Sequence, residues 1–183
     1  GAQQDNSTLC LPSDWNASRF GLGGAAPGRG GQDGPITEGS MNVAYRVGGG
    51  EPGYIAPDPT DLDIFYSGTN NGRYVDKFNR RLGTSREVNP YPWFYSGEPA
   101  IDLMERWQWT FPILFSPIDS KTLYTSSQRL WRTTDAGRTW EALSDDLTRA
   151  DPMTLQHSGG PITGDMNGPE VYATIFSVGP GKV

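Results

Sequence analysis

One loop of the sequence gathers the side chains best suited to bind a ligand. The loop covers residues 89–108 and lies within the stretch "NPYPWFYSGEPAIDLMERWQW" (89–109). Aromatic faces suit the apolar C–H faces of sugar rings, and a carboxylate pair suits the general acid and base of glycoside hydrolysis. The candidate ligand-binding residues are Tyr91, Trp93 and Tyr95, and the candidate catalytic residues are Glu98, Asp102 and Glu105. A plainer alternative stands beside these roles, in which the aromatics fill space between packed elements and the acids face solvent.

Other residues that could take part in catalysis or metal binding are interpreted as structural. His157 is the only histidine and has no nucleophile motif beside it, so it is interpreted as a loop residue rather than part of a Ser-His-Asp triad. The segment "DPTDLD" (58–63) lacks the glycine and terminal glutamate of a calcium loop, and its aspartates are expected to cap turns. Cys10 is the only cysteine, which rules out a disulfide within the chain and a CxxC motif. We therefore predict no metal site and no cofactor.

Composition and charge narrow the class of protein. The 183 residues are 35% hydrophobic and 11% aromatic, which is enough to bury a core. The formal net charge of −6 and the scattered lysines and arginines argue against a nucleic-acid-binding face. No stretch of 18 consecutive apolar residues exists, so no membrane span is predicted.

The elements that must position these residues are predicted to be strands. Short β-branched or aromatic stretches alternate with turn residues, and 24 glycines and 15 prolines imply many loops. The expected strands lie within residues 63–68, 72–78, 110–116, 121–127, 129–134 and 170–178. Residues 99–109, with Ile101, Met104 and Trp107 at roughly helical spacing, form either a turn or two of helix or loop.

The strand pattern repeats along the chain. "YIAPDPTDLDIFYSG" (54–68) aligns with "ILFSPIDSKTLYTSS" (113–127), and "TIFSVGPGKV" (174–183) resembles a third copy. The alignment places Ala56, Ser116 and Ser177 at equivalent positions, 60 and 61 residues apart. Fixed periods of this kind indicate repeat architectures, in which a propeller blade takes about 40–50 residues. The predicted repeats span about residues 1–53 (partial), 54–109, 110–169 and 170–183 (partial), within one propeller segment over 1–183.

The stretch "TTDAGRTWEAL" (133–143) joins two expected strands of one repeat. A glycine suits the positive φ of a tight hairpin, an aspartate suits capping of nearby N–H groups, and a tryptophan can cover the turn. The residues at these positions are Thr133, Asp135, Gly137, Thr139 and Trp140. They resemble the SxDxGxTW pattern of BNR or Asp-box repeats, in which the box is structural and lies away from the ligand face. A worn copy, "FNRRLGTSREV" (78–88), keeps Asn79, Gly83 and Ser85 but has Arg86 in place of the tryptophan.

Most of the chain resembles secreted bacterial Asp-box propeller proteins, described as glycosyl-hydrolase-like or sortilin-like. The similar segments are "GAQQDNSTLC", "GYIAPDP", "WQWTFPILFSP" and "SGGPIT". The resemblance implies an all-β fold, a β-propeller of four-stranded blades with about three blades represented here. It also implies a secreted or periplasmic location. In such propellers the connections between blades, here 17–52, 89–108 and 145–169, lie around the mouth of the channel.

Two functions from different classes follow. One is a carbohydrate-directed module that binds a polysaccharide or other glycan, with glycoside hydrolysis in the full-length protein as its catalytic variant; the loop at 91–105 is the motivating feature. The other is a non-catalytic scaffold for protein or peptide, for which the lack of a compelling catalytic constellation is the reason. The chain is further expected to be an excerpt of a larger propeller, ordered by the remaining blades or by another protein chain.

Overall fold

The computed structural model describes residues 53–68, 75–93, 97–159, 162 and 171–181, together with the backbone of three short strands near the N-terminus. Those strands are β1 (Ala2–Gln3), β2 (Ser7–Cys10) and β3 (Tyr45–Arg46), which pair in that order. The described residues contain no α-helix, and the prediction of an all-β chain is confirmed. None of their helical segments is long or apolar enough to cross a membrane.

The first four-stranded sheet is an antiparallel meander. Its strands are β4 (Ile55–Pro57), β5 (Ile64–Gly68), β6 (Val75–Asn79) and β7 (Thr84–Glu87), paired in chain order. In the turn from β4 to β5, Asp58 Oδ1 accepts the backbone N–H of Thr60 at 2.8 Å and its hydroxyl at 2.7 Å. Asp61 Oδ1 accepts the N–H of Asp63 at 3.1 Å. Asp58 and Asp61 therefore cap the turn as predicted, whereas the Asp63 side chain forms ion pairs with Arg80 and Arg81.

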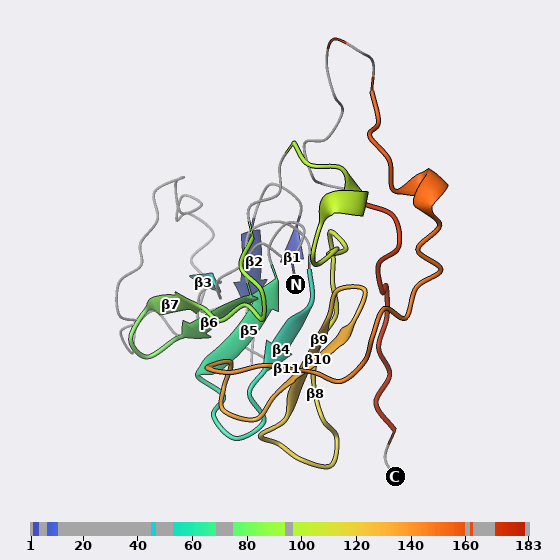
Figure 1. The fold of residues 1–183 in the computed structure, drawn as a ribbon. Coiled ribbons are helices and arrows are strands. Elements are labelled where there is room, and N and C mark those ends of the chain that lie inside the picture. The colour runs from blue at the N-terminus through green and yellow to red at the C-terminus, as the bar shows by residue number, and fades with distance from the viewer. Residues whose placement is uncertain are drawn as a thin grey trace.

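The second four-stranded sheet repeats this topology. Its strands are β8 (Ile113–Phe115), β9 (Leu123–Ser126), β10 (Leu130–Thr133) and β11 (Glu141–Ala142), again antiparallel and in chain order. Figure 1 shows the two sheets side by side, with β4 of the first next to β8 of the second. The described residues form two four-stranded sheets, whereas their identity as blades of a propeller, of which about three were expected, stays a prediction.

The first two strands of each sheet correspond with a shift of 58 residues, and the predicted shift of 60 is wrong for this hairpin. Asp58 N–H donates to the carbonyl of Ile64 at 2.9 Å, and Ser116 N–H donates to that of Thr122 at 2.8 Å. The strand registers agree, since Ala56 pairs with Tyr66 where Leu114 pairs with Tyr124. Ala56 therefore corresponds to Leu114 rather than to Ser116. The sequence alignment matched proline and serine letters, whereas the hydrogen bonds of the turn fix the true register.

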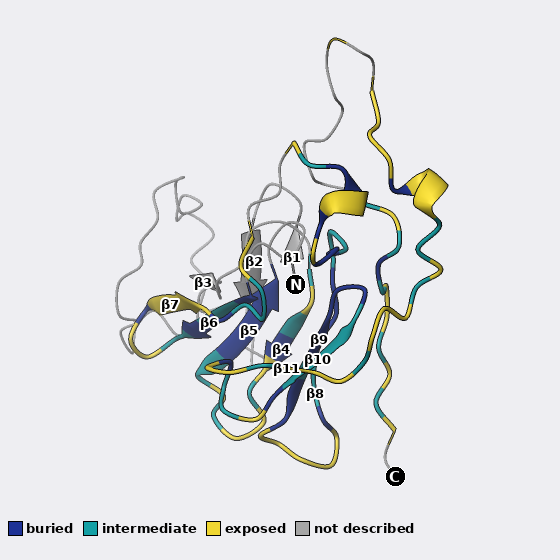
Figure 2. Ribbon diagram, viewed as in Figure 1, coloured by how far each residue is buried: buried dark blue, intermediate teal, exposed yellow. Residues whose placement is uncertain are grey.

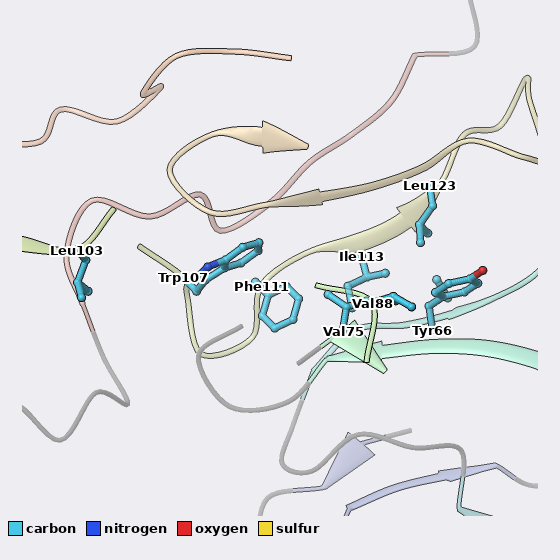
Figure 3. Close-up of a cluster of buried hydrophobic side chains, with 9 residues drawn as sticks. Tyr66, Val75, Val88, Leu103, Trp107, Phe111, Ile113 and Leu123 are labelled. Atoms are coloured by element: carbon cyan, nitrogen blue, oxygen red, sulfur yellow. The ribbon is translucent and has the colours of Figure 1, made fainter. Parts of the chain in front are cut away.

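An apolar core fills the space between the sheets (Figure 3). Its buried members are Ala56, Tyr66, Val75, Val88, Leu103, Trp107, Phe111, Ile113 and Leu123. Trp107 and Phe111 meet edge to face, with ring centroids 5.3 Å apart. Gly68 lies against Phe111, where an added Cβ would come within 3.0 Å of the ring, so the absence of a side chain at Gly68 allows the close approach. The sheets are thus joined by side chains from both and from the loop between them.

One expected strand needs correction, and one segment left open between helix and loop is settled. The expected strand at 170–178 is not formed at its described residues, 171–178. The segment 171–181 makes one backbone hydrogen bond to the second sheet, from Ile175 N–H to the Ser127 carbonyl at 3.0 Å. A strand needs a ladder of such bonds with a neighbour, and the described residues supply none there. Residues 99–109 contain a single 3-10 turn, η4 (Ala100–Asp102), and a second, η5 (Pro152–Thr154), follows the second sheet.

Figure 2 shows exposed residues on η4 and η5 and in the turns that join the strands of each sheet. In the view of Figure 1, η4 and η5 lie at the upper end, and the β4–β5, β8–β9 and β10–β11 turns lie at the lower end. The loops between sheets and the turns within them therefore present different surfaces.

Candidate functional site

The β10–β11 turn holds the five box residues, and its polar groups bond to one another. The hydroxyl of Thr133 donates to Asp135 Oδ1 over 2.8 Å and accepts the N–H of Gly137 at 3.0 Å. The Asp135 carboxylate accepts the N–H of Thr139 at 2.9 Å and the Thr139 hydroxyl at 2.7 Å, and also the N–H of Arg138 at 3.0 Å. These bonds, the backbone bond from Thr139 foremost, lower the pKa of Asp135 to about 2. The carboxylate is therefore charged and held inside its own turn.

The same turn fastens the second sheet to the first. Trp140 Nε1 donates to the carbonyl of Val88, which follows β7, at 2.7 Å. Gly137 is buried with φ at +81°, and a Cβ added there would lie 2.6 Å from the Val88 Cβ. Gly137 thus meets two demands that another residue would fail, a left-handed backbone and a close approach. Both contacts of this turn are with Val88, so the box links the second sheet to the end of the first.

The incomplete copy of the box, at residues 78–88, forms a shorter turn between β6 and β7 that is stabilised by ion pairs. Asn79 Oδ1 accepts the N–H of Leu82 at 3.1 Å, and Gly83 has φ of +62°. Arg81, at the place of the box aspartate, forms ion pairs with Asp61 at 2.5 Å and with Asp63 at 2.9 Å. The first sheet therefore replaces the carboxylate-capped turn by salt bridges to the β4–β5 turn.

The aromatic loop after β7 carries two of the three predicted ligand-binding residues within the described part. The rings of Tyr91 and Trp93 are stacked, with centroids 6.0 Å apart and an interplanar angle of 15°. Trp93 is 45% exposed, whereas Tyr91 is half-buried. Tyr95 lies outside the described residues. The pair thus forms a supported aromatic surface that faces solvent on the Trp93 side.

The three candidate acids have different surroundings. Glu105 is buried, and its Oε2 accepts the hydroxyl of Ser127 at 2.6 Å while its Oε1 lies 3.5 Å from Arg129 Nη1. Asp102 is exposed on η4, and Glu98 is half-buried just before it. Within the described residues no side-chain hydrogen bond or ion pair engages Glu98 or Asp102. Glu105 is therefore committed to the packing of the loop, and the other two acids are available to solvent.

A polar clamp holds this loop to the second sheet. Gln128 Oε1 accepts the N–H of Arg106 at 2.8 Å, and Gln128 Nε2 donates to the carbonyl of Met104 at 3.0 Å. The buried Arg106 side chain then forms an ion pair with Asp146 and donates from Nε to the carbonyl of Ala173 at 3.0 Å. The loop at 104–106 is joined in this way to three chain segments distant in sequence, at Gln128, Asp146 and Ala173.

Sequence reasoning missed this clamp. Its members are Glu105, Arg106, Ser127, Gln128, Asp146 and the Ala173 carbonyl. The one available signal was Arg106 beside Trp107 in "MERWQW", a charged residue in the middle of a segment otherwise rich in core side chains. A buried arginine requires partners, but the sequence does not say where those partners lie.

The remaining candidates stay apart from these clusters. His157 is exposed and follows η5, as expected of a loop residue. In the part of the chain that the structure describes, no group of three or more histidine, cysteine, aspartate or glutamate side chains is placed to hold a metal ion.

Comparisons with known proteins bring no further support. No family model, no curated protein and no solved structure matches the chain.

Proposed function

We propose that this chain belongs to a secreted Asp-box β-propeller and contributes a carbohydrate-binding surface through the loop after β7. The observation that carries the proposal is the stacked pair of Tyr91 and Trp93, in which residue Trp93 is 45% exposed. A large aromatic face left in solvent costs free energy unless a partner covers it, and a sugar ring offers a matching apolar face. The Tyr91 ring is stacked with the indole, which restricts its rotamers, so less side-chain entropy is lost on binding.

The hydrogen bonds within the box support a structural role for this turn, separate from a ligand-binding role for the loops between the sheets. The polar groups of the β10–β11 turn bond within the chain and leave Asp135 no open role, and that turn lies at the lower end in Figure 1, away from η4 and η5. The loops between the sheets are then the surface offered to a ligand. This arrangement agrees with a propeller whose blades are the two four-stranded sheets.

Binding is favoured over hydrolysis for the described residues. A glycosidase needs two carboxyl groups about 5–9.5 Å apart across a sugar. Glu105 is buried under Ser127 and Arg129, so only Glu98 and Asp102 of the candidate acids can meet a substrate. We therefore propose a glycan-binding module, and any hydrolytic role requires residues beyond these.

A polysaccharide panel tests the proposal directly. The wild-type protein is expected to bind at least one neutral glycan, and Trp93→Ala is expected to weaken that binding by about tenfold or more, since a stacked ring loses about 1.4 kcal/mol or more of contact. Tyr54→Ala is the matched control, because Tyr54 is 40% exposed and precedes β4. Absence of binding to every glycan, or equal loss in both variants, would overturn the proposal.

A second function is supported by a separate observation. Large apolar side chains are exposed on the segments that the polar clamp and its neighbours join, among them Met104, Leu147 and Met153. Exposed apolar surface of this kind marks protein interaction sites. A scaffold for protein partners therefore stands as the alternative proposal.

A further inference from the structure

Five exposed apolar side chains lie on three segments that hydrogen bonds tie together. These residues, which we call the loop-end surface, are Ile101, Met104, Leu147, Met153 and Tyr172, with exposed fractions of 45%, 58%, 63%, 85% and 69%. They belong to η4 and the residue stretch after it, to the chain from β11 to η5, and to the segment 171–181.

Hydrogen bonds bring the three segments to one end of the molecule. Ile101 N–H donates to the carbonyl of Leu155 at 3.0 Å, which joins η4 to the residues that follow Met153. Gln128 joins the same two segments again, since its side chain donates to the Met104 carbonyl at 3.0 Å and its own carbonyl accepts the Leu147 N–H at 3.0 Å. The third segment is joined to the first by Arg106 Nε, which donates to the Ala173 carbonyl at 3.0 Å. Figure 1 shows η4, η5 and the start of the red segment together at the upper right.

Charge around this surface is one-sided. Within the described residues of the three segments, Arg106 is paired with Asp146 and Arg149 lies 3.6 Å from Asp151. Asp102 and Asp145 are exposed and engage in no ion pair there. The sequence from Val88 to Glu105 contains no lysine, arginine or histidine. The segments that carry the apolar side chains therefore also carry unpaired negative charge, at Asp102 and Asp145.

We propose that the loop-end surface docks a protein segment that combines apolar side chains with lysines or arginines. The apolar residues of the partner would cover the two methionines and the leucine, and methionine adapts its shape to different partners. The cations of the partner would approach Asp102 and Asp145, which steers association and fixes orientation. This inference goes beyond glycan binding, and it does not depend on Tyr91 or Trp93.

The test uses a defined probe, a short fluorescent peptide of leucine and lysine with helical amphipathic spacing, titrated by anisotropy against the wild-type protein. Binding is expected to weaken as salt rises, because screening removes the charge attraction. Two peptides of equal length serve as controls, one with serine for leucine and one with glutamate for lysine, and neither is expected to bind. An unbound leucine–lysine peptide, or equal binding by the serine–lysine control, would overturn the proposal.

Variants locate the binding. The double variant Met104→Ser with Leu147→Ser and the double variant Asp102→Asn with Asp145→Asn are each expected to weaken it by about tenfold or more. The matched apolar control is Leu62→Ser with Ile118→Ser, because these side chains are 75% and 70% exposed and lie in the β4–β5 and β8–β9 turns. That control is expected to bind as the wild type does, and urea unfolding confirms that each variant is folded.

Other occupants give distinguishable results. Sedimentation that shows concentration-dependent association of the wild type, lost in the Met104 and Leu147 variant, would assign the surface to a second copy of this chain and contradict the proposal. Binding to phosphatidylcholine vesicles lost in the same variant would assign it to a lipid surface and contradict it equally. Failure of the peptide together with intact glycan binding would leave the proposed carbohydrate function standing.

Discussion

The indole Nε1 of Trp140 donates a 2.7 Å hydrogen bond to the backbone carbonyl of Val88, 52 residues earlier in the chain. Trp140 belongs to the turn that closes the second sheet, and Val88 follows the last strand of the first. One side chain thus links the two sheets, and Trp140 also packs against the core between them. The box therefore acts in the assembly of the sheets as well as in the shape of its own turn.

Trp140→Phe is expected to lower the free energy of unfolding by about 1–3 kcal/mol. The substitution keeps a ring against the core but leaves the Val88 carbonyl without its donor. Urea unfolding of the protein measures the change, with Trp93→Phe as the control for an indole that makes no such bond to the described residues. Equal stability of Trp140→Phe and the wild type would contradict the linking role.

Gly137→Ala is expected to destabilise the protein more than Gly97→Ala. Both glycines have positive φ, +81° and +97°, so both substitutions bring similar backbone strain of about 1 kcal/mol. Only at Gly137 does the new Cβ meet a neighbour, the Val88 side chain at 2.6 Å, whereas nothing lies within 4 Å at Gly97. The difference between the two midpoints of thermal unfolding measures the close approach, and a difference of zero would show that Val88 moves aside freely.

Stability is expected to fall between about pH 4 and pH 2 through Asp135. Its pKa is lowered to about 2 in the folded protein, so the carboxylate contributes stability that is fully present above its unfolded pKa and is lost as pH falls through the folded value. Asp135→Asn removes this contribution, so the stability difference between wild type and variant should shrink on acidification. A difference that stays constant across this pH range would contradict the prediction.

Gln128→Ala is expected to loosen residues 104–106 and to cost about 1–3 kcal/mol, because it leaves the Arg106 N–H and the Met104 carbonyl without their partners. Hydrogen exchange should rise at Arg106 and its neighbours. Gln156→Ala is the matched control, since Gln156 is exposed and bonds only to the nearby Pro152 carbonyl among its described contacts. Unchanged exchange at Arg106 would show that the clamp does not hold the loop.

Local patterns predicted the strands and the turns well. Residues 63–68 and 121–127 contain β5 and β9, because alternation and flanking turn residues act over a few positions. Asp58, Thr133 and Asp135 form hydrogen bonds with groups within four positions, a range over which spacing alone can indicate a turn.

Long-range contacts were beyond the sequence. The helical spacing of Ile101, Met104 and Trp107 suggested one buried face, but only Trp107 is buried and the other two are exposed. The bond between Glu105 and Ser127 spans 22 residues, and no local pattern encodes it. Residues 171–181 have strand-like composition, yet strand formation depends on a neighbouring ladder, and composition does not supply one.

The central claim is that the aromatic loop meets the ligand while the box maintains the fold. Calorimetric titration of a bound oligosaccharide into the wild type, Trp93→Ala and Trp140→Phe tests it most directly. The account predicts a loss of affinity of about tenfold or more for Trp93→Ala, with wild-type affinity for folded Trp140→Phe. Wild-type affinity in Trp93→Ala together with lost affinity in folded Trp140→Phe would contradict it.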